Sequence, residues 1–194
     1  PPACLMAFQY AGMMTVLSAE DLLFDREDIR RLLQACGAEA TDSEIGAILK
    51  ETSGYPLGTA IIARHMAAGQ PYGTELTAQV CSEVFLYFET AVYRRFDLPI
   101  RRFLLELSPF ERFDLELARI VSGDNNAAAL LDTLWRNTTM LQSRDMRSYR
   151  FRPQFRQFLL WELEREYTVE KQRTLFIRGG LYYELKEDFS SALD

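Results

Sequence analysis

The sequence of 194 residues lacks the short motifs of the common nucleotide and hydrolase sites. It has no G-x-x-x-x-G-K-[ST] phosphate loop, no G-x-G-x-x-G turn and no G-x-S-x-G elbow. Its single histidine, His65, would need a nucleophile and an orienting carboxylate to act as a catalytic base, and the sequence nominates neither. We therefore expect no catalytic residue and no enzymatic activity in this chain, and we interpret His65 as structural or surface-exposed.

Cysteine and long apolar runs are also scarce. Cys4, Cys36 and Cys81 are too far apart for a metal site, so we expect no metal and predict buried free thiols in a reducing cytoplasm. No apolar run approaches the roughly 20 residues that span a bilayer, and no signal-peptide pattern is present. We expect a cytoplasmic protein with no membrane partner. The start at Pro1, without an initiator methionine, leads us to expect a longer parent protein.

Charge is unevenly distributed along the chain. The net charge of −6 argues against nucleic-acid binding by the whole surface. Residues 17–51 hold nine acidic residues against four basic ones, whereas residues 144–156 hold five arginines against a single aspartate. The five are Arg144, Arg147, Arg150, Arg152 and Arg156. This pattern indicates that the acidic flank and the basic segment recognise a partner. A second copy of the chain is left open as that partner.

Start and stop signals predict a succession of helices. Residues 2–10 predict a short helix that Gly12 ends. Asp25 caps the next helix, which Gly37 stops, residues 41–44 fit a capping box, and Pro56 suits the first turn of the helix after that. Apolar residues at helical spacing predict further helices at 57–68, 74–96, 100–107, 115–121, 127–135 and 169–185, with another opened by Pro153. Residues 13–17 predict a strand, whose partner sheet would lie outside this sequence.

The helical pattern is interrupted once. Residues 139–142 and 148–151, around a polar turn at 143–145, predict a two-stranded hairpin. Three helices followed by a hairpin are typical of a winged helix. The predicted fold class is mainly α: a helical bundle, a winged-helix domain with one β-hairpin, and the start of an α-solenoid. The predicted segments are a remnant of a nucleotide-binding domain (1–24), a helical domain (25–72), the winged helix (73–166) and the first helical repeat (167–194).

The arginine-rich hairpin has three interpretations. The wing of a winged helix can lie along DNA phosphates, but a major-groove reader needs several Arg, Lys, Asn or Gln near the start of its recognition helix. The helix at 127–136 carries Asp132 and a single arginine. An intramolecular or nucleotide-facing role and a plain solvated surface are the alternatives.

Three stretches carry a resemblance to a known family. Residues 51–58 resemble the pattern T-x-G-W-P-x-G with tyrosine in place of tryptophan, residues 103–113 resemble F-L-x-x-S-x-L-x-x-F, and residues 149–159 resemble Y-R-Y-H-x-L-F-x-x-F-L. In this order they look like the middle of the large ATP-binding transcriptional regulators of the LuxR family, relatives of the maltose-regulon activator in the STAND class of NTPases. Residues 1–24 resemble the end of the family's nucleotide-binding domain.

The resemblance implies a function and a set of site residues. Gly54, Tyr55 and Pro56 would line the adenine side of a nucleotide, and Arg152 stands where the family has a phosphate-facing histidine. ATP or ADP would bind in the parent protein, with no cofactor in this chain alone. The chain would couple nucleotide state to a sensor and a DNA-binding domain outside it, and its partners would be the parent's own domains. The alternatives are a stand-alone winged-helix DNA-binding protein and a helical-repeat scaffold for protein interaction.

Overall fold

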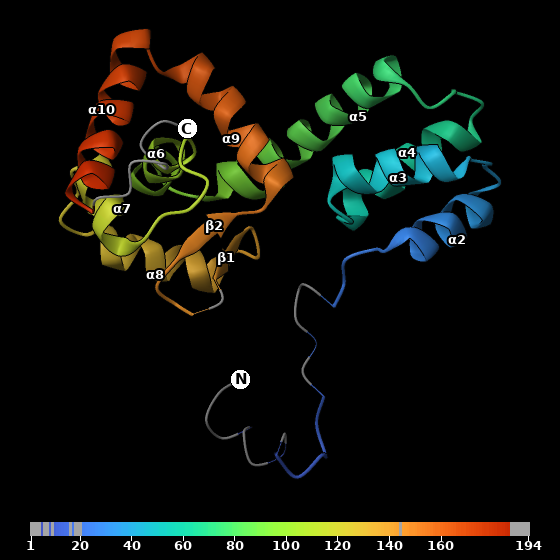
Figure 1. The fold of residues 1–194 in the computed structure, drawn as a ribbon, viewed down its shortest axis with the longest axis horizontal. Helices are drawn as coiled ribbons and strands as arrows, with labels where there is room; N and C mark the ends of the chain where they lie inside the picture. The colour runs from blue at the N-terminus through green and yellow to red at the C-terminus, as the bar shows by residue number, and fades with distance from the viewer. Residues whose placement is uncertain are drawn as a thin grey trace. The chain divides into compact units, whose positions relative to one another are not determined.

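The computed structural model describes residues 5, 8, 10–15, 17, 21–143 and 145–186, and these are mainly helical (Figure 1). The chain divides into two compact units, residues 1–84 and 85–194. The predicted fold class of helices with a single β-hairpin is confirmed. The second helix of the expected solenoid pair falls in residues 187–194, outside the described residues, and the predicted segment boundaries stay a prediction.

The described part of the first unit is a small helical bundle. Its helices are α2 (Arg26–Cys36), α3 (Asp42–Thr52), α4 (Pro56–Ala67) and α5 (Thr74–Tyr87), the last of which continues into the second unit. Their apolar faces meet in a core that includes Ile29, Leu33, Ile45, Ile48 and Ile62. Burial of these branched aliphatic side chains supplies the main stabilisation of a unit this small.

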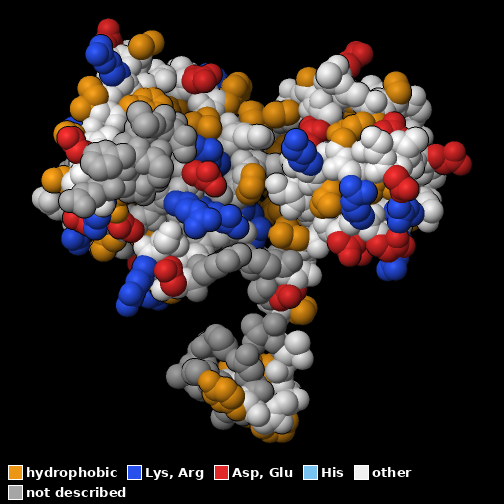
Figure 2. All heavy atoms as spheres, viewed as in Figure 1, with side chains coloured by type: hydrophobic (Ala, Val, Ile, Leu, Met, Phe, Trp, Pro, Cys, Tyr) orange, Lys and Arg blue, Asp and Glu red, His pale blue; other side chains and the backbone are white. Residues whose placement is uncertain are grey.

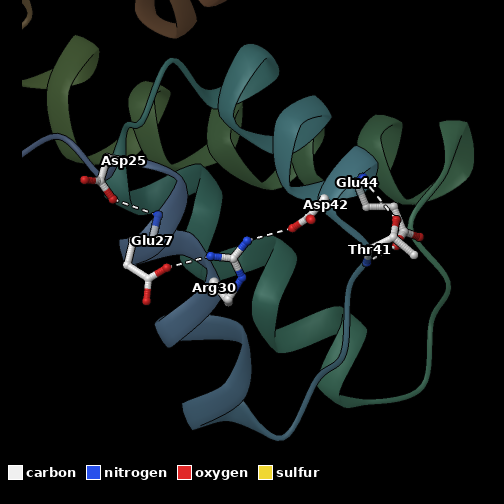
Figure 3. A network of polar contacts seen from close by, with 6 residues as sticks. All are labelled: Asp25, Glu27, Arg30, Thr41, Asp42 and Glu44. Carbon is white, nitrogen blue, oxygen red and sulfur yellow. Dashed lines mark hydrogen bonds and ion pairs between the residues drawn. The ribbon is translucent and has the colours of Figure 1, made fainter.

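Local hydrogen bonds fix the ends of α2 and α3, as the sequence predicted. The Asp25 carboxylate accepts hydrogen bonds from two backbone N–H groups of the first turn of α2, and Gly37 ends that helix in the left-handed region at φ 79°. Thr41 and Glu44 form a reciprocal capping box at the start of α3. Arg30 on α2 then reaches Asp42 at 2.7 Å, so one guanidinium ties the two helices together (Figure 3).

Two expectations for the first unit are wrong at the residues that the structure describes. Of the predicted strand at 13–17, the described residues 13–15 and 17 are irregular or bent, and Met13 and Leu17 are largely exposed. No described segment pairs with them, and an unpaired strand leaves its N–H and C=O groups without partners. The predicted burial of the thiols is also wrong: Cys36, the last residue of α2, is exposed, and Cys81 is half-buried. Cys4 lies outside the described residues.

The second unit begins with an irregular helical stretch. After α5 the chain widens into a π-helix η1 (Phe88–Val92) and tightens into a 3₁₀ turn η2 (Tyr93–Arg95), where the sequence predicted one continuous helix. Thr90 Oγ1 donates a hydrogen bond to the backbone oxygen of Leu86 at 2.7 Å, a bond that competes with regular helix hydrogen bonding. Phe88 and Tyr93 point into the core of the unit.

Three helices and a hairpin follow in the predicted order. They are α6 (Leu98–Leu107), α7 (Leu115–Ser122), α8 (Ala127–Asn137), β1 (Leu141–Ser143) and β2 (Tyr149–Phe151). The strands pair antiparallel with Gln142 opposite Arg150, and Phe113 forms an additional bridge to Tyr149 on the other edge of β2. Three paired segments at the foot of three helices are the architecture of a winged helix, with α8 in the place of the recognition helix.

The remaining helices close the core of the second unit. They are α9 (Pro153–Glu166) and α10 (Val169–Leu185). Phe155 and Phe158 of α9 are fully buried, and their rings lie within 6 Å of the Phe88 ring. Helix α10 packs on α7, where Gly179 lies against the ring of Phe110. The helix predicted at 169–185 is confirmed.

Candidate functional site

The face that a winged helix would turn to DNA carries few free basic groups. The buried side of α8 is made by Ala127, Leu131 and Leu134. On its exposed side the one arginine, Arg136, is held by Asp132, whose two carboxylate oxygens lie 3.0 and 2.9 Å from Arg136 Nε. Opposite charges one helical turn apart neutralise each other. The helix therefore presents little net positive charge to a phosphate backbone.

The arginines of the hairpin divide into structural and exposed groups. Arg152 is only 6% exposed, and its Nε donates to the backbone oxygen of Thr139 at 2.8 Å. Arg156 donates to the backbone oxygens of residues 108 and 109, just beyond the end of α6. Arg150 is exposed and bonds Gln142 across the hairpin at 3.1 Å, and Arg147 is exposed at the tip. Arg144 lies outside the described residues. Figure 2 shows Lys and Arg side chains over the hairpin with Asp and Glu side chains beside them.

Hydrogen bonds among residues 145–149 shape the tip of the wing. The Asp145 carboxylate accepts hydrogen bonds from the backbone N–H groups of Arg147 and Ser148. Met146 adopts the left-handed region at φ 59°, and its backbone oxygen accepts a hydrogen bond from the Tyr149 hydroxyl at 2.8 Å. A left-handed residue other than glycine is strained, so these bonds are needed to hold the turn. The result is a methionine side chain, 55% exposed, at the end of the wing.

A hollow of about 630 Å³ lies between the wing, α8 and the start of α7. Leu131, Trp135, Met146 and Tyr149 give it an apolar lining. Its charged rim is formed by Asp114, Glu116, Arg119, Asp132 and Arg147. Three carboxylates among five charges are the opposite of what a DNA-binding face needs, since phosphate contacts are made by excess Lys and Arg.

The residues predicted to line the adenine side of a nucleotide form a tight turn before α4. Gly54 adopts φ 73°, and its backbone oxygen accepts a hydrogen bond from the Phe24 N–H at 2.8 Å. A Cβ atom at this position would lie 2.5 Å from the backbone oxygen of Phe24, so only glycine fits. Tyr55 is half-buried at the N-cap, and Pro56 occupies the first turn of α4. These three residues therefore form a helix-breaking turn between α3 and α4.

The structure brings Gly54, Tyr55 and Pro56 together but assigns Arg152 to the other unit. Arg152 is the N-cap of α9, which begins with Pro153 and has no side-chain cap. These residues offer an apolar and aromatic edge in one unit, and a guanidinium beside a helix start in the other. Both features are compatible with parts of a nucleotide. Their role as a nucleotide site stays a prediction.

Sequence reasoning missed the hollow beside the wing. Trp135 ends the helix predicted at 127–135, and Met146 falls between the predicted polar turn at 143–145 and the predicted strand at 148–151. No local pattern joins Trp135 to the hairpin, because the contact is tertiary: the Trp135 ring on α8 packs against the Tyr149 ring on β2, with centroids 6.1 Å apart. Within the described residues no helix is long and apolar enough to cross a membrane, and no group of His, Cys, Asp or Glu is arranged to hold a metal ion.

The order of α6, α7, α8 and the hairpin defines the second unit as a winged-helix domain. The comparison with protein-family models agrees, since residues 89–171 match the model described as the MalT winged helix domain. This chain therefore carries a MalT-type winged helix, a module of the transcription-regulator kind. The match covers less than half of the chain and bears on the second unit. A search of the curated proteins found no match.

Proposed function

We propose that this chain is the regulatory arm of an ATP-dependent transcriptional regulator of the LuxR family, in the STAND class of NTPases. Its winged helix would contact the parent's own domains and would leave DNA reading to a domain outside the chain. It would contribute no catalytic residue itself and would work in the cytoplasm.

The observation that carries this proposal is the electrostatics of α8 and the wing. A DNA reader needs free donors at the start of the recognition helix, and α8 begins with three alanines. Its one arginine is paired with Asp132, and Arg152 and Arg156 bind backbone oxygens within the domain. Only Arg147 and Arg150 are exposed among the described arginines of the hairpin.

The proposed contact with a nucleotide rests on the two segments named by the resemblance. Pro56 and Tyr55 offer apolar and aromatic surface to a purine. Arg152 lies at the start of α9, where the helix dipole favours an anion, and its guanidinium, now buried and bonded to Thr139, would have to turn outward to bind a phosphate. ATP, when bound to the parent, would supply the γ-phosphate whose presence distinguishes the two regulatory states.

DNA binding provides the first test. Fluorescence anisotropy with labelled duplex DNA should show weak binding that disappears by about 200 mM salt, as expected of non-specific contacts. Tight binding that survives this salt concentration and falls when Arg147 and Arg150 are changed to alanine would favour a stand-alone DNA-binding protein. Asp132→Ala provides a matched control, because freeing Arg136 should strengthen any DNA contact made by α8.

Nucleotide binding in the full-length parent provides the second test. Arg152→Gln should weaken ATP or ADP binding by roughly tenfold or more, because one charge-assisted hydrogen bond contributes about 1.5–3 kcal/mol. Arg150→Gln, two residues away on the exposed side of β2, should leave the affinity unchanged. Equal affinities for the Arg152→Gln protein and the wild type would contradict the proposed role of Arg152. An upstream reading frame without a phosphate loop would contradict the ATP-dependent function as a whole.

The helical-repeat scaffold is less well supported. That alternative required a regular stack of helix pairs without a wing, and the described residues contain the β1–β2 hairpin. A single helix, α10, follows the winged helix within the described residues.

A further inference from the structure

A polar hollow of about 560 Å³ lies between one face of α6 and the loop that joins α7 to α8. All of its lining residues belong to the second unit, and none of them belongs to the wing. Helix α6 contributes Leu98, Arg102 and Glu106, and the loop contributes Asp124 and the two asparagines that follow it. A hollow of this size accommodates a small molecule, and its charged lining requires a polar one.

The carboxylate of Glu106 is the most deeply buried charged group of the hollow, with a side chain only 3% exposed. Its Oε1 accepts hydrogen bonds from Arg102 Nε at 2.7 Å and from the Tyr167 hydroxyl at 3.1 Å. Its Oε2 accepts none from any described residue. Among the described residues an enclosed oxygen without a partner occurs only at Gln154, so Glu106 Oε2 is reached from the hollow that Glu106 lines.

A structural tie between α6 and the end of α9 explains only half of this carboxylate. Tyr167 is the C-cap of α9, and burial together with the nearby Glu106 raises the pKa of its hydroxyl, which therefore stays protonated as a donor. That donor needs one acceptor, which a glutamine would supply without the burial of a charge. The second oxygen of Glu106 is left as a position where a ligand can donate a hydrogen bond.

The charges around the hollow balance one another. Arg102 is 61% exposed and opposes Glu106, and its terminal nitrogens form no ion pair with any other described carboxylate. On the loop side Asp124 is accompanied by Arg178, whose Nη1 lies 3.6 Å from the position of a Cβ on Gly123. Two carboxylates beside two guanidiniums attract neither a simple cation nor a simple anion strongly. They suit a neutral ligand that carries both charges.

We propose that this hollow binds a free α-amino acid with an apolar side chain. The ammonium group of the ligand donates to Glu106 Oε2, and its carboxylate accepts hydrogen bonds from the terminal nitrogens of Arg102. The two protein groups already lie side by side, so their dipole faces the reversed dipole of the ligand. The apolar side chain rests on Leu98, which is 73% exposed, and on Pro99.

This site adds a small-molecule signal to the winged helix itself, beyond the proposed coupling to nucleotide. Binding requires no nucleotide and no residue outside the second unit. Its test therefore gives the same answer whether or not the parent protein is an ATPase.

Saturation-transfer NMR of the 194-residue chain tests the site, with L-leucine as the probe. We expect a dissociation constant on the order of 1 mM, as an open hollow and a ligand of this size allow. The analogue 4-methylpentanoate lacks the ammonium group, and 3-methylbutylamine lacks the carboxylate. Each should bind at least about tenfold more weakly than leucine, because each leaves one charged group of the protein without its partner.

Two variants test the residues. Arg102→Gln, an exposed change, should weaken leucine binding at least about tenfold. Glu106→Gln keeps an acceptor for the Tyr167 hydroxyl and should weaken binding to a similar extent. Arg119→Gln is the matched control, because Arg119 is an exposed arginine of the second unit outside this hollow, and it should leave the affinity unchanged. Circular dichroism verifies that each variant remains folded.

Three results would overturn the proposal. The first is the absence of any leucine signal at about 20 mM ligand. The second is an unchanged affinity in the folded Arg102→Gln and Glu106→Gln proteins. The third is equally tight binding of 3-methylbutylamine, which would identify a plain cation site instead.

Discussion

Two adjacent glycines in α10 should respond in opposite ways to the same substitution. A Cβ atom on Gly179 would come closer to the ring of Phe110 than real Cβ atoms do, whereas a Cβ on Gly180 would meet no atom within 4 Å. Phe110 is itself buried, so its ring has little room to move away. Gly179→Ala therefore forces α10 away from the domain, and Gly180→Ala adds a methyl group in open space.

The magnitudes follow from packing and helix propensity. Overpacking a filled core costs about 1–3 kcal/mol, and replacing glycine by alanine within a helix returns roughly 1 kcal/mol. The free energy of unfolding should fall by up to about 2 kcal/mol for Gly179→Ala and rise by about 0.5–1 kcal/mol for Gly180→Ala. The two variants should thus differ by roughly 2 kcal/mol, which is about 1 M in the urea midpoint.

Tryptophan fluorescence is the appropriate assay. The chain has two tryptophans, and both Trp135 and Trp161 lie in the second unit, so the signal reports this unit without the first. Equal midpoints for the two variants would refute the packing of Gly179 against Phe110.

Three further predictions concern single contacts. Gly54→Ala should lower the free energy of unfolding of the first unit by at least about 1–2 kcal/mol, measured by hydrogen exchange, because of its positive φ and the nearby backbone oxygen of Phe24. Hydrogen bonds from Thr41 lower the pKa of Glu44 below its usual 4.5. Their contribution to the free energy of unfolding is therefore present above pH 4.5 and is lost as the pH falls through the lowered pKa. Glu44→Gln should therefore flatten the acid limb of the stability curve of the first unit, and a slope identical to wild type would count against the capping box. Tyr182→Phe should destabilise the second unit by about 1–2 kcal/mol in the fluorescence assay, because it leaves the Asp114 carboxylate without its hydroxyl partner; no change would show that the bond contributes nothing.

The candidate site was only partly predictable. The turn at Gly54 and the position of the hairpin follow from the sequence, since turns depend on glycine, proline and polar residues within a few positions. Whether each arginine of the hairpin is exposed or bound within the domain does not follow from the sequence. Arg152 and Arg156 look alike in the sequence, yet each binds backbone oxygens more than ten residues away, which removes them from the basic surface.

The sequence by itself determined where helices begin and end, because the groups that cap them lie within four residues of one another. Asp25, Thr41 and Gly37 do in the structure what their spacing predicted. Only the tertiary structure decided which faces remain open. The rotation of α10, fixed by the hydrogen bond from Tyr182 to Asp114 and by the fit of Gly179, turns some of its apolar side chains inward and leaves others exposed. No local pattern records that choice, because it depends on contacts with residues about 70 positions earlier in the chain.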